Sequence, residues 1–310
     1  MDLRHVCWLA VSLILFALQT AWPATTFRVA TFNLEGYLTE PTDSRPAKSE
    51  QSRTNVHTTL LKLQPDVLAL QEVGGTNALL EIQMALAKGG LELPYWDLVQ
   101  GADTNIQVAV LSRFPFSARR PHEREDFLLN GRRFRVSRGY AEVDIMVATN
   151  YSFTLLTAHL KSKRPVFSAD EAELRLEEAK LLREKIDARL AEDPQANLVV
   201  LGDLNDTKDA ASTKAVMGRY RNKLVDTRPA ERNGDGDLSS GPGLGTARRN
   251  ITWTHYYSKE DSYSRIDFIL LSQGMAREWM PNETYVFTSP DWGLASDHRP
   301  VAATFRAEDL

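Results

Sequence analysis

The stretch Ser296-Asp297-His298-Arg299-Pro300-Val301 places an aspartate and a histidine directly before an apolar run. Five further segments join a short apolar run to a carboxylate, amide or imidazole: Thr31-Phe32-Asn33, Leu70-Gln71-Glu72-Val73, Thr157-Ala158-His159-Leu160, Leu201-Gly202-Asp203-Leu204-Asn205 and Arg265-Ile266-Asp267-Phe268. Short apolar runs bounded by polar residues are typical of buried strands. Strands that each carry a polar group at one end predict one convergent site. Carboxylates suit Mg²⁺, and imidazoles and amides suit phosphate oxygens, so the pattern predicts metal-assisted phosphoester hydrolysis.

Taken together and in this order, the six segments resemble the motifs of the endonuclease/exonuclease/phosphatase superfamily. That group includes deoxyribonuclease I, neutral sphingomyelinases and inositol polyphosphate 5-phosphatases. The resemblance covers roughly Phe27 to Phe305. It implies an α/β fold in which two mixed sheets, flanked by helices, form a four-layer α/β/β/α sandwich. It also implies a metal-dependent phosphoric ester hydrolase that uses Mg²⁺, for which Mn²⁺ can substitute.

The resemblance further implies a metal site. It makes Glu72 the principal metal ligand, has Asn33 support the metal or contact the phosphate, and places Asp297 near the metal or the attacking water. The residue pattern favours the same role for Glu72, because a carboxylate at the end of an apolar strand is costly unless it is paired or binds a metal.

Asp203 and Asn205 lie two positions apart after an apolar run. Side chains at i and i+2 of an extended chain point the same way, so both are expected to face the cleft. The Asp203 carboxylate can orient or deprotonate a water, and the Asn205 amide can hold a phosphoryl oxygen; the resemblance implies the same roles. The alternative is a turn in which these side chains cap the local backbone. Asp206 is expected to face away from the site.

Two histidines are further candidates. The resemblance makes His298 a phosphate ligand or a stabiliser of the pentacovalent transition state, and makes Asp267 the carboxylate that fixes its tautomer. The alternative for Asp267 is a surface aspartate in an Arg-Asp pair. His159 can bind phosphate or help to protonate the leaving oxygen. Gln107 is the nearest polar candidate to orient His159, in place of the acidic residue that the family often uses.

A basic stretch interrupts an otherwise acidic chain of net charge −4. Eight arginines fall between Arg113 and Arg138. Arginine suits bidentate phosphate recognition, so the stretch is either a rim that binds a polyanion or a solvated basic face, and Arg138 is a candidate phosphate ligand. His57, His122 and His255 have no motif context and are expected to be surface or packing residues. Trp292 is expected in the core rather than in the cleft.

Periodicity predicts helices over Ser49–Leu63, Asn77–Lys88 and about Ala169–Ala191. Ser168 and Glu171 match a capping box at the start of the last helix. The runs Tyr140–Val147 and Tyr151–Leu156 predict a hairpin, which argues against a purely parallel sheet. The segment from Ala230 to Arg249 is rich in Gly, Asp, Asn and Ser and is typical of a long loop.

The N-terminus predicts export. Arg4 precedes the apolar run Val6–Leu18 and the small-residue end at Ala24, which is the pattern of a secretory signal. We therefore expect a signal peptide over 1–24, a single domain over 25–310, a secreted or periplasmic location and no stable membrane insertion after the leader is removed. The single cysteine, Cys7, lies inside the leader. We expect a monomer.

Three functions remain open from the sequence. The first is a Mg²⁺-dependent phosphodiesterase whose partner is nucleic acid, that is, a nuclease. The second is a sphingomyelinase-like or phosphoinositide-type phosphohydrolase, which the lack of a long apolar insertion for membrane docking disfavours. The third is a non-catalytic binding protein on the same scaffold, which the intact set of motif residues disfavours.

Overall fold

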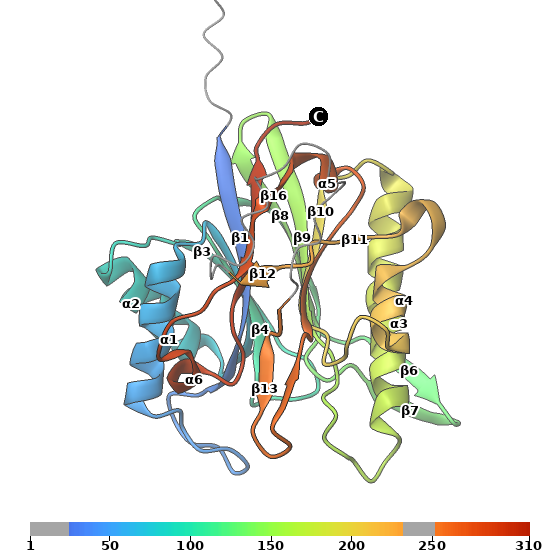
Figure 1. The fold of residues 1–310 in the computed structure, drawn as a ribbon. Helices are drawn as coiled ribbons and strands as arrows, with labels where there is room; N and C mark the ends of the chain where they lie inside the picture. Colours follow the sequence, from blue (N-terminus) through green and yellow to red (C-terminus); the bar gives the residue numbers. More distant parts are fainter. Residues whose placement is uncertain (1–24, 232–251) are drawn as a thin grey trace, which may run out of the picture.

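A computed structural model describes residues 25–231 and 252–310 of the 310-residue chain. Two mixed β-sheets pack face to face, and helices cover both outer faces (Figure 1). The predicted four-layer α/β/β/α sandwich is therefore confirmed. The predicted leader and nearly all of the predicted loop at 230–249 lie outside the described residues.

The first sheet contains both motif-bearing strands from the N-terminal part of the chain. Within the described residues its strand order is β12 (Ala230–Glu231), β16 (Trp279–Val286), β17 (Val301–Arg306), β1 (Thr26–Tyr37), β2 (Val67–Val73), β4 (Gln107–Ser112) and β3 (Tyr95–Val99). Strands β1 and β2 are parallel, and β17 is antiparallel to β1.

The second sheet faces the first. Its order in the described part of the chain is β11 (Val225–Asp226), β15 (Asp267–Leu271), β10 (Leu198–Asp203), β9 (Tyr151–His159), β8 (Tyr140–Ala148) and β5 (Phe116–His122). Strands β8 and β9 form the predicted antiparallel hairpin, whereas β9 and β10 are parallel. Two hairpins lie outside the sheets: β6 (Asp126–Leu129) with β7 (Arg132–Arg135), and β13 (His255–Tyr257) with β14 (Ser262–Ser264).

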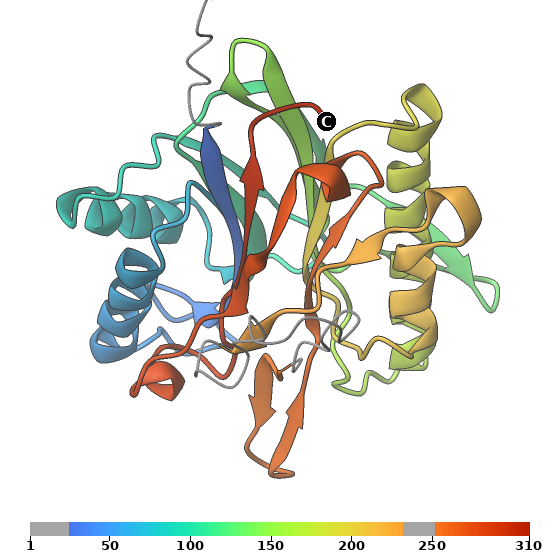
Figure 2. The same cartoon turned by 45° about the horizontal axis from the view of Figure 1, so that its top comes forward.

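The helices form the outer layers. Helices α1 (Glu50–Leu63), α2 (Thr76–Lys88) and the short α6 (Trp292–Ala295) lie beside the first sheet, and α3 (Glu171–Glu192) and α4 (Ala211–Met217) beside the second (Figures 1 and 2). The short helices η1 (Tyr220–Asn222) and α5 (Met275–Glu278) lie in connections. No helix in the described ranges is long and apolar enough to cross a membrane.

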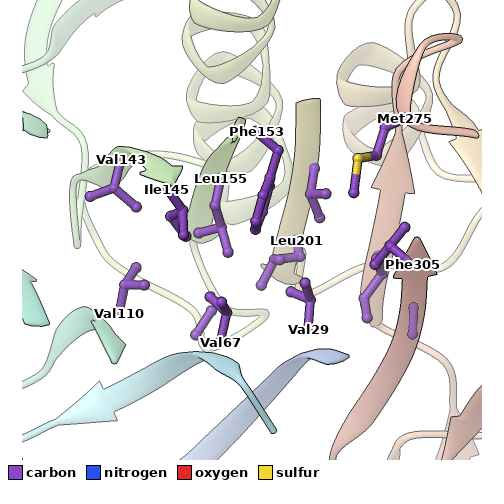
Figure 3. Close-up of a cluster of buried hydrophobic side chains, with 14 of the residues drawn as sticks. Val29, Val67, Val110, Val143, Ile145, Phe153, Leu155, Leu201, Met275 and Phe305 are labelled. Atoms are coloured by element: carbon purple, nitrogen blue, oxygen red, sulfur yellow. The ribbon is translucent and has the colours of Figure 1, made fainter. Parts of the chain in front are cut away.

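The strands are apolar on both faces because each sheet is covered on both sides. Val29 and Val67 of the first sheet meet Leu155 and Leu201 of the second in the central layer (Figure 3). The alternate residues of β1, such as Phe32, instead pack under α1 and α2. This two-sided burial fixes the register of the strands, and so fixes where each strand ends.

The start of α3 differs from the prediction. The capping box of Ser168 and Glu171 is wrong, because Asp170 caps the helix and accepts hydrogen bonds from the backbone N–H groups of Ala172 and Glu173, each at 2.9 Å. A β-bridge between Val166 and Ala169 holds the preceding residues out of the helix. The carboxylate next to the first helical turn therefore takes the capping position.

The strand directions place the motif residues at one end of the sandwich. Parallel strands β1 and β2 end near Asn33 and Glu72, and parallel strands β9 and β10 end at His159 and Asp203. Strand β15 runs the other way, so its first residue, Asp267, lies opposite Asp203. Strand β17 is also antiparallel to its neighbour β1, and His298 lies three residues before its first residue, Val301.

Candidate active site

Asn33 connects the two sheets at the centre of the site. Its amide nitrogen donates to a carboxylate oxygen of Asp203 at 2.9 Å and lies 3.5 Å from Oε1 of Glu72. Its amide oxygen accepts a hydrogen bond from the backbone N–H of Glu35 at 3.0 Å. The predicted residues from β1, β2 and β10 therefore meet around one amide.

His298 lies between two carboxylates. Its Nδ1 is 2.9 Å from Oδ2 of Asp267, and its Nε2 is 3.8 Å from Oδ2 of Asp203. Burial by itself would lower the pKa of His298, but the charges of Asp267, Asp203 and Asp297 outweigh it and raise the pKa to about 10. His298 is therefore an imidazolium at neutral pH, with Nδ1 committed to Asp267 and Nε2 directed into the site.

Asp203 is buried at the end of β10. It accepts hydrogen bonds from Asn33 and from the backbone N–H of Asn205, the latter at 2.8 Å. Burial raises the pKa of Asp203 above the ordinary range of an aspartate, although the charge of His298 opposes this. The residue before it must be glycine, because Gly202 has φ 129° and a Cβ there would lie 2.0 Å from the carbonyl oxygen of Ala158. A carboxyl with a raised pKa is suited to accept a proton near neutral pH.

Asn205 is close to Asp203 but not for the predicted reason. The strand ends at Asp203, and Asn205 adopts a left-handed conformation with φ 53°, so the i, i+2 rule for extended chains does not apply. Its amide nitrogen donates to the carbonyl oxygen of Leu160 at 3.0 Å and lies 3.2 Å from Asp203. The turn alternative describes the local geometry, and the amide group still borders the site.

Asp206 faces away from the site, as expected. Its carboxylate pairs with Arg175 of α3 at 3.0 Å and accepts a hydrogen bond from Ser212 of α4.

His159 lies on the other side of Asp203. Its Nε2 is 3.5 Å from Asp203 and 3.9 Å from Glu72. Burial, and then the charge of Arg138, hold the pKa of His159 well below its usual range. Its Nδ1 has no hydrogen-bond partner in the described residues, so Gln107 does not orient the ring. A neutral imidazole of this kind can donate or accept one hydrogen bond at Nε2.

Glu72 and its neighbours form an acidic group that suits a divalent metal. Glu72 has a positive φ of 63°, and the Arg45 guanidinium and the neutral His159 ring are each 3.9 Å from its carboxylate. Burial, followed by the charge of Asp297, raises the pKa of Glu35, which also faces Glu72. Including Asp203 and Asp267, the carboxylates here outnumber the cations. This excess of oxygen donors fits a hard ion such as Mg²⁺ or Mn²⁺.

Lys48 is a further cation beside this acidic group. Its ammonium is 3.7 Å from Glu35. Burial lowers the pKa of Lys48, while the charges of Glu35, Asp297 and Glu72 oppose the shift. Neither Lys48 nor Glu35 was recognised from the sequence; the position of Glu35 two residues after Asn33 is the one signal that could have indicated it.

His255 belongs to the site, although sequence reasoning left it out. Its Nε2 is 3.6 Å from Oδ2 of Asp297, and its ring centroid is 4.5 Å from that of His298. Burial would raise the pKa of Asp297, but the hydrogen bond from His255 and the charge of His298 lower it. His57 and His122 instead contact Tyr37 and Glu142 at 2.6 and 2.8 Å and are not part of this group.

Buried hydroxyl groups hold the site residues in place. Ser296 Oγ donates to the carbonyl oxygen of Asn33 at 2.8 Å and accepts from the N–H of His298 at 3.1 Å. Thr254 Oγ1 accepts from the N–H of Asp267 at 3.2 Å. Sequence reasoning did not single out either side chain, because their contacts join segments that are distant in the chain.

The arginines between Arg113 and Arg138 do not form one surface. Arg113 pairs with Asp66, and Arg120 with Asp144, on the flank of the sandwich. Arg132 and its neighbours lie on the β6–β7 hairpin. Arg138 is buried beside the site, where it donates to the carbonyl oxygen of Leu160 at 3.3 Å, and its Nε has no hydrogen-bond partner among the described residues.

Trp292 lies in α6, where it is half-buried and packs edge-on against Trp253 at 5.1 Å. The expectation that Trp292 is a core residue is therefore wrong.

Comparisons with known proteins agree with the geometry. A sequence model of the Endonuclease/Exonuclease/phosphatase family matches residues 30–298. No curated protein sequence matches the chain. Among solved structures, truncated TDP2 from Caenorhabditis elegans is 17% identical, with 91% of this chain and 98% of that chain covered and a TM-score of 0.58. The catalytic domain of human Nocturnin is 15% identical (coverage 91% and 95%, TM-score 0.60). Sphingomyelinase C from Streptomyces griseocarneus is 19% identical (coverage 91% and 100%, TM-score 0.58).

Proposed function

Because the chain belongs to the endonuclease/exonuclease/phosphatase family, whose members are metal-dependent phosphoester hydrolases, we propose that it is an exported nuclease. Its substrate would be the phosphodiester backbone of nucleic acid. The observation that carries the proposal is the placement of a buried Asp203 between the Asn33 amide and the charged Asp267–His298 pair. This arrangement offers a base and a cation 3.8 Å apart, so that one phosphate could contact both.

In the proposed reaction Asp203 orients a water molecule and accepts its proton as the water oxygen attacks phosphorus and the P–O bond to the leaving oxygen breaks. Asn33 and the backbone N–H of Asn205 hold the Asp203 carboxylate, so its direction is fixed before the substrate arrives. A raised pKa places this carboxyl closer to the operating pH than an exposed aspartate, which favours proton transfer in the transition state.

The histidines would act on the charge that develops at phosphorus. His298 offers an N–H from Nε2 and a positive charge, while Asp267 holds the opposite ring nitrogen. Such fixed donors stabilise a transition state because they need no rearrangement during the reaction. Neutral His159 would contribute a hydrogen bond to a phosphoryl oxygen or to the leaving oxygen. The Asn205 amide lies 3.2 Å from the same Asp203 carboxylate.

Glu72 would hold the divalent metal, with Asp297 and Asn33 as neighbouring oxygen donors, and we propose that the natural ion is Mg²⁺. When bound, the metal would neutralise phosphate charge and polarise the P–O bond. The set of oxygen donors disfavours Zn²⁺, which is usually bound through sulfur and imidazole nitrogen.

A substrate panel tests the proposed function. The protein, freed of its leader, is incubated with single-stranded DNA, RNA, sphingomyelin, a phosphoinositide and bis-(p-nitrophenyl) phosphate, in Mg²⁺ and in EDTA. We expect cleavage of a nucleic acid and slow hydrolysis of the small diester, both abolished by EDTA. Hydrolysis of a lipid with neither DNA nor RNA cleaved would overturn the nuclease assignment and leave the phosphohydrolase class intact.

We also propose that the protein acts outside the cytoplasm, on the strength of Arg4 and the apolar run Val6–Leu18. Mass spectrometry of the exported protein should find an N-terminus near residue 25. Soluble extracellular protein that still begins at Met1 would contradict the leader.

A further inference from the structure

The β13–β14 hairpin is fixed to the segment that carries His298. His255 forms a β-bridge with His298. Two backbone hydrogen bonds flank the bridge. The N–H of Tyr256 donates to the carbonyl oxygen of Asp297 at 3.0 Å, and the N–H of Arg299 donates to the carbonyl oxygen of Thr254 at 2.7 Å. The base of the hairpin therefore has a defined position relative to the reacting groups, and the hairpin projects beyond the strand ends (Figure 1).

The two faces of this hairpin differ. Tyr256 and Tyr263 are cross-strand partners with ring centroids 4.6 Å apart, and Tyr263 also packs on Trp253 at 4.9 Å. His255 and Tyr257 lie on the opposite face, because alternate residues of a strand point to opposite sides. Their rings are stacked at 6.3 Å with an interplanar angle of 24°.

The rings on the second face form a row that starts in the site. The ring centroids of His298 and His255 are 4.5 Å apart, and the ring of Tyr257 stacks next to that of His255. Tyr257 is 39% exposed. The row therefore ends in an aromatic ring that solvent reaches.

The strand order places this row at one side of the reacting centre and cations at the other. Across the second sheet the order β15, β10, β9, β8 presents Asp267, Asp203 and His159 in turn, followed by Arg138 just before β8. Arg45 lies on the same side, where it pairs weakly with Glu72 at 3.9 Å. A substrate that spans the site would thus meet aromatic rings on the His298 side and guanidinium groups on the His159 side.

We propose that His255 and Tyr257 form a stacking subsite for one unpaired nucleobase next to the scissile phosphate, while Arg138 and Arg45 face the following phosphate. The inference rests on the proposed nuclease function and narrows its substrate to single-stranded nucleic acid, since a base within a duplex has no free face. A lipid fits the hairpin poorly, because its tip, Ser258-Lys259-Glu260-Asp261, is polar and exposed.

Stacking on an aromatic side chain is sequence-tolerant and contributes a measurable part of single-strand affinity. The test uses a short single-stranded oligonucleotide with one cleavable phosphodiester and phosphorothioates elsewhere, which keep the negative charge and resist cleavage. An abasic residue is placed on either side of the cleavable bond in turn. Tyr257→Ala should raise KM for the intact oligonucleotide by about 5- to 100-fold with little change in kcat, and Tyr257→Trp should restore it.

Two features make the test specific for stacking. An abasic residue on one side of the cleavable bond should raise the KM of the wild type to that of Tyr257→Ala with the intact oligonucleotide. Tyr257→Ala with the abasic oligonucleotide should then show no higher KM than either change alone. Tyr263→Ala, on the other face of the same hairpin and 55% exposed, is the matched control and should leave KM unchanged.

The outcomes separate the two proposals. If the wild type cleaves the oligonucleotide and Tyr257→Ala does not differ from it, the stacking subsite is overturned and the nuclease remains. The stacking subsite is also overturned if Tyr257→Ala raises KM by the same factor for the intact and the abasic oligonucleotides. If the wild type cleaves no nucleic acid, the proposed function is wrong and the subsite falls with it; loss of sphingomyelin vesicle binding in Tyr257→Ala would then assign the hairpin to lipid.

Discussion

At the scale of single residues, the site is set by which groups carry charge. His298 is charged because Asp267 lies 2.9 Å from its Nδ1, whereas His159 is neutral because it is buried next to Arg138. Two histidines of the same site therefore have different chemistry. Asp203 lies between them and contacts both, so its carboxylate is the natural position for a base.

Replacement of Asp203 or His298 should lower the rate of the chemical step. Asp203→Asn removes the proposed base and His298→Ala the proposed cation, so each should lower kcat by at least about 10²-fold, with a smaller effect on KM. Steady-state kinetics on a single-stranded oligonucleotide measures both constants. Asp206→Asn is the control for a general disturbance of the loop after β10. Asp206 lies in that loop, but its carboxylate pairs with Arg175 instead of facing the site. Near-wild-type kcat in either test variant would remove that residue from the mechanism.

At the scale of elements, the site is built from strand ends, and this part was predictable. Local apolar runs indicated the strands and their polar ends without knowledge of the fold. The direction of Asn205 was not predictable from those runs, since it depends on where β10 stops pairing. The place of His255 depends on the pairing of β13 with residues 297–299, a contact between segments that are distant in the chain.

The β6–β7 hairpin carries the second element-scale prediction. Arg132, Arg133 and Arg135 are exposed on this hairpin, which lies beside α3 (Figure 1). Phosphate contacts release counterions, so substitution of all three by glutamine should raise KM for long DNA or RNA several-fold and flatten its dependence on salt. Hydrolysis of bis-(p-nitrophenyl) phosphate should change little.

A control of equal charge is available at the far end of α4. Arg219, Arg221 and Lys223 are exposed, and their replacement by glutamine changes the net charge by the same amount. The control should leave the polymer KM nearly unchanged. Equal effects from the two triple variants would mean that the β6–β7 hairpin acts only through overall charge.

At the scale of the whole molecule, the two ends of β9 contribute to different properties. One end lies in the candidate active site, and the other end contacts a buried carboxyl whose protonation affects stability. His159 ends this strand in the site, whereas Tyr151 begins it and hydrogen-bonds the buried Glu278. Glu278 lines a cavity of about 490 Å³ together with Asn197 and Asp309. Burial raises the pKa of Glu278 to about 7, although the hydrogen bond from Tyr151 favours a lower pKa.

This shift predicts how stability depends on pH. The folded pKa lies above the ordinary glutamate value of 4.5, so between pH 4.5 and 7 the folded state binds more protons than the unfolded state. The free energy of unfolding should therefore fall as pH rises through this window, by about 1–3 kcal/mol. Glu278→Gln should unfold at a higher temperature than wild type at pH 8 and at a similar temperature at pH 4.5. Calorimetry at the two pH values measures this; equal melting temperatures at pH 8 would contradict it.

The central claim is that a divalent metal held by Glu72 serves phosphodiester hydrolysis at the Asp203–His298 site. The most direct measurement is the rate of cleavage of a phosphodiester substrate against Mg²⁺ concentration, for wild type and for Glu72→Gln, with folding of both checked by circular dichroism. We expect a saturable rise for wild type, complete loss in EDTA, and for folded Glu72→Gln a rate at least about 10²-fold lower at every Mg²⁺ concentration. Wild-type turnover that persists in EDTA, or a Glu72→Gln variant with the Mg²⁺ dependence of wild type, would contradict the claim.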